Sequence, residues 1–402
     1  MALPSILRAD VRGKRVLVRA DLNVPVENGR VTDTTRIDRF AAGMRPLLAR
    51  GARLVILTHF GRPKRSEMNP AYSVDKLRPA LSRALGVDVR FSDVCADNSA
   101  VILSNALRDG EALLCENLRY NEGETDNDPA FAAELAKLGD IYVNDAFSCA
   151  HRAHASTDAL ARLLPAYAGP LLIEEIDALS AALEAPQKPA VAIVGGAKVS
   201  SKIAVLKNLV RKLDHVIIGG GMANTFLFAS GAAMGRSLHE ADQVETVREI
   251  EALARVHGCC LHLPRDVVVA REFKAHAAHE VVPADACPQD AMILDAGPEA
   301  EAKFAAVLEG CRTILWNGPL GAFEMQPFDA ATVALAQKAA ALTRAGRAVS
   351  VAGGGDTVAA LNAAGVAQDF TYVSTAGGAF LEWLEGRELP GIAALHAAEC
   401  AA

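Results

Sequence analysis

The chain has 402 residues, of which 51% are apolar and 22% charged, and its formal net charge is −7. At about 150 residues per domain, this length favours two large domains or three small ones over a single core. The negative balance argues against broad binding to nucleic acids or acidic membranes. The eight cysteines include no C-x-x-C pair, so they indicate neither a zinc site nor a disulfide framework and suit a reducing cytosol.

In the first half of the chain, short apolar runs alternate with longer segments of helical period. The runs predict buried strands at residues 16–19, 54–58, 89–91, 113–115 and 141–143. The segments between them predict helices at residues 37–50, 74–85 and 129–138. This alternation is typical of βαβ units, which build a parallel sheet.

The second half of the chain repeats this pattern. Strands are predicted at residues 191–194, 216–218, 292–294, 313–316, 348–351 and 371–373. Helices are predicted at residues 202–213, 300–308, 331–343 and 357–364. Residues 216–235 carry no charge, but their glycines and polar side chains favour a buried strand, a glycine turn and a buried helix over a membrane span.

Prolines between residues 165 and 189 bracket a helical run at 171–183, so the connection between the halves is itself expected to be a helix. We therefore predict an α/β fold of two doubly wound parallel-sheet (Rossmann-like) domains of similar size, joined by a helical linker. The predicted boundaries are 1–170 for the first domain, 171–188 for the linker and 189–387 for the second domain. In such sheets, ligands bind beyond the carboxyl ends of the strands.

Arginine and histidine side chains gather after the predicted strands of the first domain. Guanidinium groups form forked hydrogen bonds to phosphate or carboxylate, so this gathering predicts a site for a small phosphorylated or carboxylated metabolite. Asp21 and Asn23 are available to its hydroxyl groups. The cluster comprises Asp21 and Asn23 after the first strand, Arg36 in the first turn of the next helix, His59 and Arg62 after the second strand, Arg119 after the fourth, and His151, Arg152 and His154 after the fifth.

Glycine-rich loops follow the strands of the second domain, and such loops bring backbone N–H groups close to a phosphate at the start of a helix. They lie at residues 195–202, 219–224, 295–298 and 353–357. Lys198 and Lys202 are four residues apart, so we expect them to share one helical face and reach one polyphosphate. None of these loops is a P-loop or a G-x-G-x-x-G fingerprint, so only the set of them indicates a nucleotide site.

Two further segments supply groups suited to a magnesium nucleotide. Asp356 follows the glycines at 353–355 and is a hard oxygen ligand of the kind that Mg²⁺ prefers. Asn317 and Glu324 lie in the segment WNGPLGAFE, where they are expected to hydrogen-bond an adenine or a ribose.

Taken in order, these stretches resemble the phosphoglycerate kinase family. The resemblance is carried by RADLNVP at 19–25, THFGRP at 58–63, ENLR at 116–119, the segment 145–154, GGAKVSSK at 195–202, GGGMA at 219–223, WNGP at 316–319 with FE at 323–324, and GGGDT at 353–357. It implies reversible transfer of the acyl phosphate of 1,3-bisphosphoglycerate to MgADP, giving 3-phosphoglycerate and MgATP, in glycolysis or gluconeogenesis. It also implies that the acid binds to the first domain, that the nucleotide binds to the second, and that a C-terminal segment at about 388–402 packs back on the first.

The resemblance also implies the roles of individual residues. The acid substrate would contact Asp21, Asn23, Arg36, His59, Arg62, Arg119 and Arg152. The nucleotide would contact Lys198, Lys202, Gly220, Gly221, Gly297, Asn317, Pro319, Glu324, Gly354, Gly355, Asp356 and Thr357, with Asp356 as the Mg²⁺ ligand. The transferring phosphoryl group would be stabilised by Arg36, Lys198, Lys202, Gly355 and Gly378. The chain departs from the family at Phe60, at Ser148-Cys149, and at Ala376, which stands where a third glycine is usual.

The enzyme implied is a cytoplasmic monomer that bends at a hinge and binds neither nucleic acid nor membrane. Two other classes stay open from the residues alone. One is a nicotinamide-dependent dehydrogenase, although the dinucleotide fingerprint is missing. The other is a two-lobed solute-binding protein, although the first eight residues show no secretory segment. An inactive relative with a scaffolding role is a third alternative.

Overall fold

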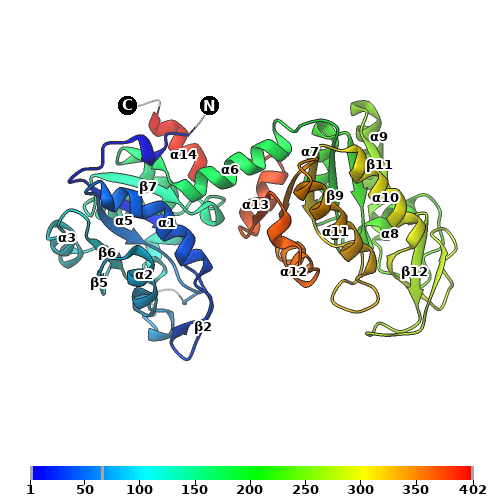
Figure 1. Cartoon of the computed structure of the whole chain (residues 1–402), viewed down its shortest axis with the longest axis horizontal. Coiled ribbons are helices and arrows are strands. Elements are labelled where there is room, and N and C mark those ends of the chain that lie inside the picture. The colour runs from blue at the N-terminus through cyan, green and yellow to red at the C-terminus, as the bar shows by residue number, and fades with distance from the viewer. Residues whose placement is uncertain (1–2, 65–67, 400–402) are drawn as a thin grey trace. The chain divides into compact units, whose positions relative to one another are not determined.

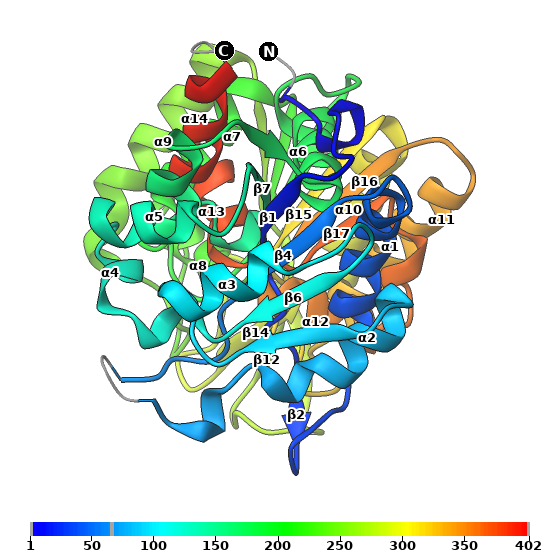
Figure 2. The same ribbon diagram turned by 90° about the vertical axis from the view of Figure 1, so that its left-hand side faces the viewer.

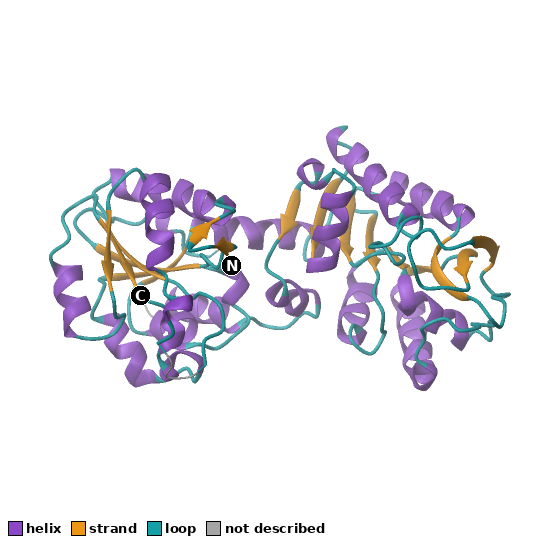
Figure 3. Ribbon diagram, turned by 90° about the horizontal axis from the view of Figure 1, so that it is seen from below, coloured by secondary structure: helices purple, strands orange, loops and turns teal. Residues whose placement is uncertain are grey.

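The computed structural model describes residues 3–64 and 68–399 of the chain. It divides into two compact units (Figure 1). Unit 1 comprises Met1–Ile176 and Glu388–Ala402, and unit 2 comprises Asp177–Arg387. In both units, helices lie on both faces of a central sheet (Figure 3).

Unit 1 is built on a parallel sheet with the strand order β5-β6-β4-β1-β7-β8 (Figure 2). Its strands are β1 (Arg15–Ala20), β4 (Arg53–Leu57), β5 (Val89–Ser92), β6 (Ala112–Cys115), β7 (Ile141–Asp145) and β8 (Ala166–Ala168). In the centre of this sheet, Val16 pairs with Leu54 on one side and with Ile141 on the other. These central strands are apolar on both faces because helices cover both sides. A hairpin of β2 (Val26–Glu27) and β3 (Arg30–Val31) follows β1.

The helices of unit 1 begin at recognisable caps. Asp97 accepts hydrogen bonds from the N–H groups of Ser99 and Ala100, and Asp128 caps the helix that starts with Pro129. The helices are α1 (Thr35–Ala49), α2 (Arg78–Leu85), α3 (Asn98–Asn105), α4 (Glu122–Thr125), α5 (Pro129–Ala136) and the C-terminal α14 (Pro390–Glu399). Short 3₁₀ turns lie at Ile6–Arg8, Pro70–Tyr72, Asp75–Leu77, Leu118–Tyr120, Phe147–Cys149 and Leu160–Arg162, and a π-turn at Ala155–Ala159.

Helix α6 (Pro170–Leu183) begins in unit 1, where a buried carboxylate caps it. Oδ1 of Asp145, at the end of β7, accepts hydrogen bonds from the N–H groups of Leu171 (2.7 Å) and Leu172 (3.2 Å). Gly169 makes room for this carboxyl group, because a Cβ atom there would lie 2.2 Å from Oδ1. Burial raises the pKa of Asp145 to about 7, against the lowering effect of the two N–H groups.

Unit 2 has a parallel sheet of its own, with the order β11-β10-β9-β15-β16-β17. Its strands are β9 (Ala190–Val194), β10 (His215–Ile218), β11 (Cys260–His262), β15 (Thr313–Asn317), β16 (Val349–Gly353) and β17 (Tyr372–Ser374). Its helices are α7 (Ile203–Lys212), α8 (Gly220–Ala229), α9 (Val244–His257), α10 (Pro298–Gly310), α11 (Ala330–Arg344), α12 (Gly355–Ala363) and α13 (Gly378–Leu384), with 3₁₀ turns at Ala241–Gln243 and Ala367–Asp369. The uncharged stretch at 216–235 holds β10 and α8, and none of the described helices is long and apolar enough to cross a bilayer.

A second, antiparallel sheet in unit 2 corrects one expectation. It has the order β13-β12-β14 and consists of β12 (Asp266–Ala270), β13 (His279–Pro283) and β14 (Met292–Ala296). Residues 292–294 therefore form a strand, as predicted, but not a strand of the parallel sheet. The reason is that β14 pairs with β12, which runs antiparallel to it. The apolar residues of this sheet pack with Leu227 and Met234 in a small core of their own.

The buried core of each unit lies between its sheet and its helices. In unit 1 it includes Phe40, Met44 and Leu54, and in unit 2 Phe304, Trp316 and Leu335. The strand order reverses between β1 and β7 in unit 1, and between β9 and β15 in unit 2. Such reversals open a crevice at the carboxyl edge of a sheet, which is where ligands bind. The predicted fold of two doubly wound α/β domains is confirmed.

Candidate active site

At the reversal point of unit 1, where the strand order changes direction between β1 and β7, a carboxylate accepts two hydrogen bonds. Asp21, directly after β1, accepts a hydrogen bond on Oδ2 from Nη1 of Arg36 (2.7 Å) in the first turn of α1. The same oxygen accepts from the hydroxyl of Ser148 (2.5 Å), in the turn that follows β7. Burial alone would raise the pKa of Asp21, but the positive charge of Arg36 and the other neighbours lowers it below its usual value. Asp21 is therefore an ionised anchor that orients Arg36.

His59, after β4, is the most enclosed histidine of this cluster and contacts a buried arginine. Its Nδ1 lies 3.1 Å from Nη2 of Arg19 and 3.9 Å from Sγ of Cys149. Burial, and then the charge of Arg19, lowers the pKa of His59 to about 3. His59 is therefore neutral at physiological pH, and so is His154, whose pKa burial and the surrounding arginines lower to about 4.

The remaining predicted residues of the acid site also lie at this edge. Oδ1 of Asn23 accepts a hydrogen bond from the N–H of Gly61 (3.0 Å), and Nη1 of Arg119 donates to the carbonyl of Gly61 (2.5 Å). Arg62 is close enough to Arg119 to lower its pKa, although burial is the larger cause. Arg152 contributes in the same way to the lowered pKa of His154. The structure thus brings several cationic side chains together at this edge of the sheet, and those of Arg62 and Arg152 are exposed.

Lys202 occupies the reversal point of unit 2. Its Nζ donates to the carbonyls of Gly195 (2.6 Å), after β9, and Asn317 (3.0 Å), at the end of β15. Burial lowers the pKa of Lys202 to about 8, and the nearby carboxylate of Asp356 opposes that shift. Phosphate oxygens are better partners for an ammonium group than two carbonyls, so this lysine is available to a polyphosphate.

The expectation that Lys198 and Lys202 share one helical face is wrong. Helix α7 begins only at Ile203, and Lys198 is exposed in the irregular loop before it. Gly196 adopts a φ of 145°, a conformation that leads the chain away from a helix at this point. The two ammonium groups therefore come from a loop and from the residue that precedes a helix.

The loop between β16 and α12 is tied to the end of β15. Nδ2 of Asn317 donates to the carbonyl of Gly353 (2.8 Å), and Oγ1 of Thr357 accepts from the N–H of Gly318 (2.7 Å). Gly354 adopts a φ of 99°, and a Cβ atom there would lie 2.8 Å from Nδ2 of Asn317, so only glycine fits. Gly355 and Asp356 then form the first turn of α12, with N–H groups facing outward and an exposed carboxylate beside them.

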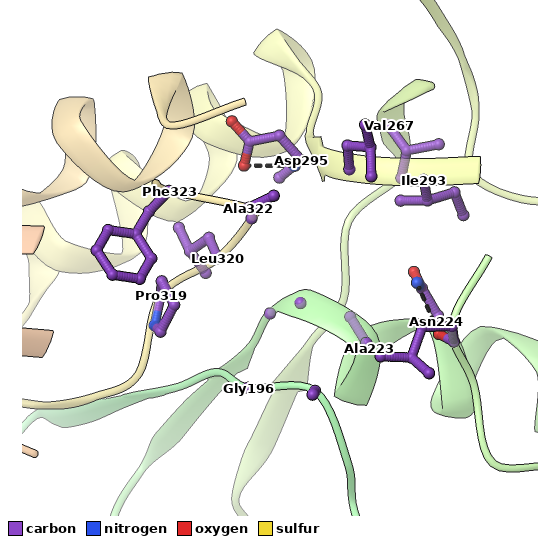
Figure 4. Close-up of a pocket in the computed structure, with 18 of the residues that line it drawn as sticks. Gly196, Ala223, Asn224, Val267, Ile293, Asp295, Pro319, Leu320, Ala322 and Phe323 are labelled. Carbon is purple, nitrogen blue, oxygen red and sulfur yellow. Dashed lines mark hydrogen bonds between the residues drawn. The ribbon is translucent and has the colours of Figure 1, made fainter. Parts of the chain in front are cut away.

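A cavity of about 440 Å³ lies beside these loops in unit 2. Figure 4 shows its apolar side, which is formed by Val267 and Ile293 of the antiparallel sheet and by Leu320 and Phe323 after β15. Asn224 is on the same wall as Ala223, and its Nδ2 donates to the carbonyl of Leu238. Of the predicted nucleotide residues, those that line the cavity are Gly220, Gly221, Pro319, Glu324 and Asp356. Its size and apolar lining suit a flat base.

Other predicted residues lie outside this cavity. Gly297 precedes α10 and makes room for the carboxyl group of Asp266, which caps that helix. Gly378 begins α13. Ala376 is not among the described residues with positive φ, so its methyl group strains no backbone, and its N–H donates to Oγ of Ser374 (3.2 Å). Lys198 and Gly354 lie in loops at the carboxyl edge of the sheet, Asn317 ends β15, and Gly355 and Thr357 belong to the first turn of α12.

Some residues of these sites were not predicted from the sequence. Arg19 is part of the RADLNVP segment, but its burial and its contact with His59 need the fold. Phe273 and Arg236 line the cavity from loops that no motif marks. Within the described residues, no three His, Cys, Asp or Glu side chains are arranged to hold a metal ion. A metal at Asp356 would therefore need ligands from the nucleotide itself, as Mg²⁺ commonly has.

Comparisons with known proteins find a family model, sequence relatives and solved structures that match nearly the whole chain. The sequence model of a family described as phosphoglycerate kinase matches residues 6–387. A phosphoglycerate kinase of Methylobacterium radiotolerans is 60% identical over 387 residues, 96% of each chain, and one of Cereibacter sphaeroides is 58% identical over 96% of this chain and 98% of the relative. The structure of phosphoglycerate kinase from Coxiella burnetii matches with a TM-score of 0.92 at 43% identity, over 98% of this chain and 99% of the other. That of the Pyrococcus horikoshii enzyme matches with 0.80 at 29% identity, over 99% of both.

Proposed function

The chain belongs to the phosphoglycerate kinase family, and from this premise we propose how its residues divide the work of the reaction. The reaction is reversible phosphoryl transfer between 1,3-bisphosphoglycerate and ADP, which gives 3-phosphoglycerate and ATP in glycolysis. Family membership removes the dehydrogenase and the solute-binding protein as alternatives. The observation that carries the proposal is the pair of cation-lined reversal points, one in each unit.

Unit 1 is the proposed acid-binding domain. Arg62, Arg119 and Arg152 supply permanent positive charge to the phosphate and carboxylate of 3-phosphoglycerate. Asp21 and Asn23 are placed for its hydroxyl group, and His59 is a neutral hydrogen-bonding partner. The exposed guanidinium groups of Arg62 and Arg152 support this assignment, because they are open to an anionic ligand.

Unit 2 is the proposed nucleotide-binding domain. The base would lie in the cavity beside Gly220, Gly221 and Pro319, with Glu324 near the ribose. Lys198, Lys202 and the N–H groups of Gly354 to Thr357 would then bind the phosphates. Gly297 does not line the cavity, and its contribution is to make room for the carboxyl group of Asp266. Asp356 would hold Mg²⁺, since its exposed carboxylate is a hard oxygen ligand next to the phosphate-binding loop. When bound, the ion would neutralise charge on the phosphates.

Transfer itself requires alignment and charge compensation more than covalent chemistry. Arg36 is the proposed stabilising group from the acid side, and Lys202 from the nucleotide side. Asp21 keeps Arg36 oriented through the 2.7 Å contact, and the N-termini of α12 at Gly355 and α13 at Gly378 add positive potential. No general base is needed, because the acceptor is already an ionised phosphate or carboxylate.

The acid and nucleotide residues belong to different units, so we propose that the enzyme closes around its two substrates. Reacting atoms must approach to about 3–3.5 Å, and closure also removes water that would hydrolyse the acyl phosphate. We further propose that the enzyme works as a cytoplasmic monomer, since each predicted site is complete within one chain.

Calorimetry on single variants tests the division into two binding sites. We expect Arg62→Ala and Arg119→Ala to weaken 3-phosphoglycerate binding about tenfold or more and to leave ADP affinity unchanged. Arg90→Ala is the matched control, because Arg90 is also on unit 1 but pairs with Glu111 away from the site. If ADP binding weakens as much as acid binding in the two site variants, the assignment of the domains is wrong. A coupled assay with ATP and 3-phosphoglycerate tests whether the chain is an inactive relative.

A further inference from the structure

Arg19 is a buried cation whose place in the site calls for an explanation. It is 1% exposed and is the second-to-last residue of strand β1, and among the described residues no carboxylate contacts its guanidinium group directly. Burying a charge without an ion-pair partner is costly, so the hydrogen-bond partners of this group are the place to look for its role. We propose that Arg19 is a positioning residue that holds His59 as the neutral tautomer with its proton on Nε2.

The hydrogen bond between the two side chains has only one possible direction. Nη2 of Arg19 lies 3.1 Å from Nδ1 of His59. A guanidinium group has donors and no acceptor, so Nδ1 of His59 must accept. An imidazole that accepts on Nδ1 is neutral and carries its one proton on Nε2. The geometry therefore selects one of the two neutral tautomers and excludes the imidazolium form.

A second set of contacts keeps Arg19 in this position. Its Nε donates to Oγ of Ser156 (2.9 Å), and its Nη1 donates to the carbonyl of Ala20. Ser156 in turn donates from Oγ and from its backbone N–H to the two carboxylate oxygens of Glu124 (2.6 and 3.0 Å). Glu124 and Ser156 are both fully buried. The chain Glu124–Ser156–Arg19–His59 thus links a buried carboxylate to the histidine of the acid site.

The other charged groups around His59 favour the same neutral form. Arg119 and His154 approach it from the turns that follow β6 and β7, and Cys149 lies 3.9 Å from Nδ1. The negative charge of Asp21 acts in the other direction and favours the charged form. Burial is the largest cause of the lowered pKa, followed by Arg19. Between pH 5 and 8, His59 therefore offers a donor rather than a charge.

This role deepens the proposed function and rests on the assignment of the acid site to unit 1. If His59 contacts 3-phosphoglycerate there, its Nε2–H donates to a substrate oxygen. The opposite tautomer would present a lone pair to that anionic oxygen and repel it. Arg19 thus acts on the substrate through His59 and need not touch it.

Nitrogen NMR of the labelled, unliganded protein tests the tautomer without any substrate. In long-range ¹H–¹⁵N spectra at pH 7, we expect Nδ1 of His59 at the shift of an unprotonated ring nitrogen and Nε2 at that of a protonated one. Arg19→Gln removes the cation, and the pKa of His59 should then rise toward its ordinary value of about 6.5. Arg15→Gln is the matched control, since Arg15 is on the same strand but pairs with Asp140. A proton on Nδ1 in the wild-type spectrum overturns the proposal, whether or not the variant folds.

Kinetics then tests whether the tautomer serves the reaction. In Arg19→Gln, we expect the KM for 3-phosphoglycerate to rise about tenfold or more above the pKa of His59, where the neutral ring can adopt either tautomer, with the KM for ATP unchanged, relative to Arg15→Gln over the same pH range. Below that pKa the imidazolium again carries a proton on Nε2, so the loss should shrink. Arg19→Lys, which restores a cation, should recover part of the loss. His59→Gln places an amide N–H near the position of Nε2 and should bind the acid better than His59→Asn. If the tautomer is as expected but all these KM values are unchanged, Arg19 does not position a substrate contact, and the fault lies in the assignment of the acid site.

Discussion

Lys202 is a residue of the proposed nucleotide site, and its pKa is lowered by burial. Its ammonium group bridges the carbonyls of Gly195 and Asn317 in a largely buried position. We expect Lys202→Ala to lower turnover about 10²- to 10³-fold, the loss typical of removing one preorganised donor that stabilises developing negative charge. It should also lower the free energy of unfolding by about 1–2 kcal/mol, because two buried carbonyls lose their donor. Steady-state assays and urea unfolding measure the two effects.

Lys207→Ala is the control for that experiment. Lys207 is on α7, the helix that Lys202 precedes, but its ammonium group pairs with Glu249 on the surface. Its substitution should change neither turnover nor stability by much, since exposed ion pairs contribute little. Near wild-type turnover in a folded Lys202→Ala protein would remove Lys202 from the transfer step.

The pKa of Lys202 predicts a pH dependence that its arginine variant lacks. Burial lowers this pKa to about 8, and only the protonated form can bind phosphate. The kcat/KM for ATP should therefore fall as pH rises through about 8 in the wild type. Lys202→Arg should be flat over this range, at a lower absolute rate, because guanidinium stays protonated. The effect on stability has the opposite direction. Between about pH 8 and 10.5 the unfolded chain holds a proton that the folded chain has lost, so the free energy of unfolding should rise with pH in this range. A wild-type profile without a step near pH 8 contradicts the assignment.

At the scale of single elements, Asp145 connects strand β7 to the start of α6. Asp145→Ala removes the acceptor for the N–H groups of Leu171 and Leu172 and should lower the free energy of unfolding by about 1–2 kcal/mol. Asp145→Asn keeps an acceptor and should lose less. Thermal unfolding of the two variants side by side checks this ranking. Equal losses would show that the carboxyl group does not act as a cap.

The same carboxyl group should make stability depend on pH. Burial raises the pKa of Asp145 to about 7, above its ordinary value near 3.9. The folded state therefore holds a proton that the unfolded state releases, and this contribution to stability is lost as pH rises from about 4 through 7. Asp145→Asn should flatten that decline. Asp295 in unit 2, whose pKa burial also raises to about 7, is unaffected by the substitution and leaves a residual slope.

The comparison of sequence and structure is also clearest at the scale of elements. Most of the parallel strands could be predicted because they are short apolar runs that are buried on both faces, as in β9 and β10. The edge strands β8 and β11 were not predicted, because each has only three residues and is incompletely buried. The antiparallel sheet could not be predicted, because β13 is largely exposed and its pattern HEVVP carries no two-sided burial. The site motifs were found because their residues are close in sequence. The contacts of Arg19 were not, because Ser156 and His59 are 137 and 40 residues away from it.

At the scale of the whole molecule, the proposed closure predicts a cooperative response to ligands. A ligand shifts an open–closed equilibrium only by its differential affinity for the closed form. Each substrate alone binds chiefly to one unit, so it should shift the equilibrium partly, whereas both together should complete the shift. Small-angle scattering should therefore show a clear fall in the radius of gyration only in the ternary mixture. An equal fall with nucleotide alone would mean that the acid site has no part in closure.

The return of the last helix to unit 1 has a consequence for the order of folding during synthesis. Unit 2 is one continuous stretch, Asp177–Arg387, and all of its strands are complete before α14 is made. Unit 1 is made first, but at that point it lacks α14, which contacts the turns that follow His154. It also lacks the hydrogen bond that the N–H of Gly391 in α14 donates to the carbonyl of Ala150. All the strands and helices of the second unit have therefore been synthesised while the first unit still lacks its last helix. We therefore expect the acid site, which includes the turn Phe147–Cys149 next to this hydrogen bond, to reach its final structure only after α14 has been made.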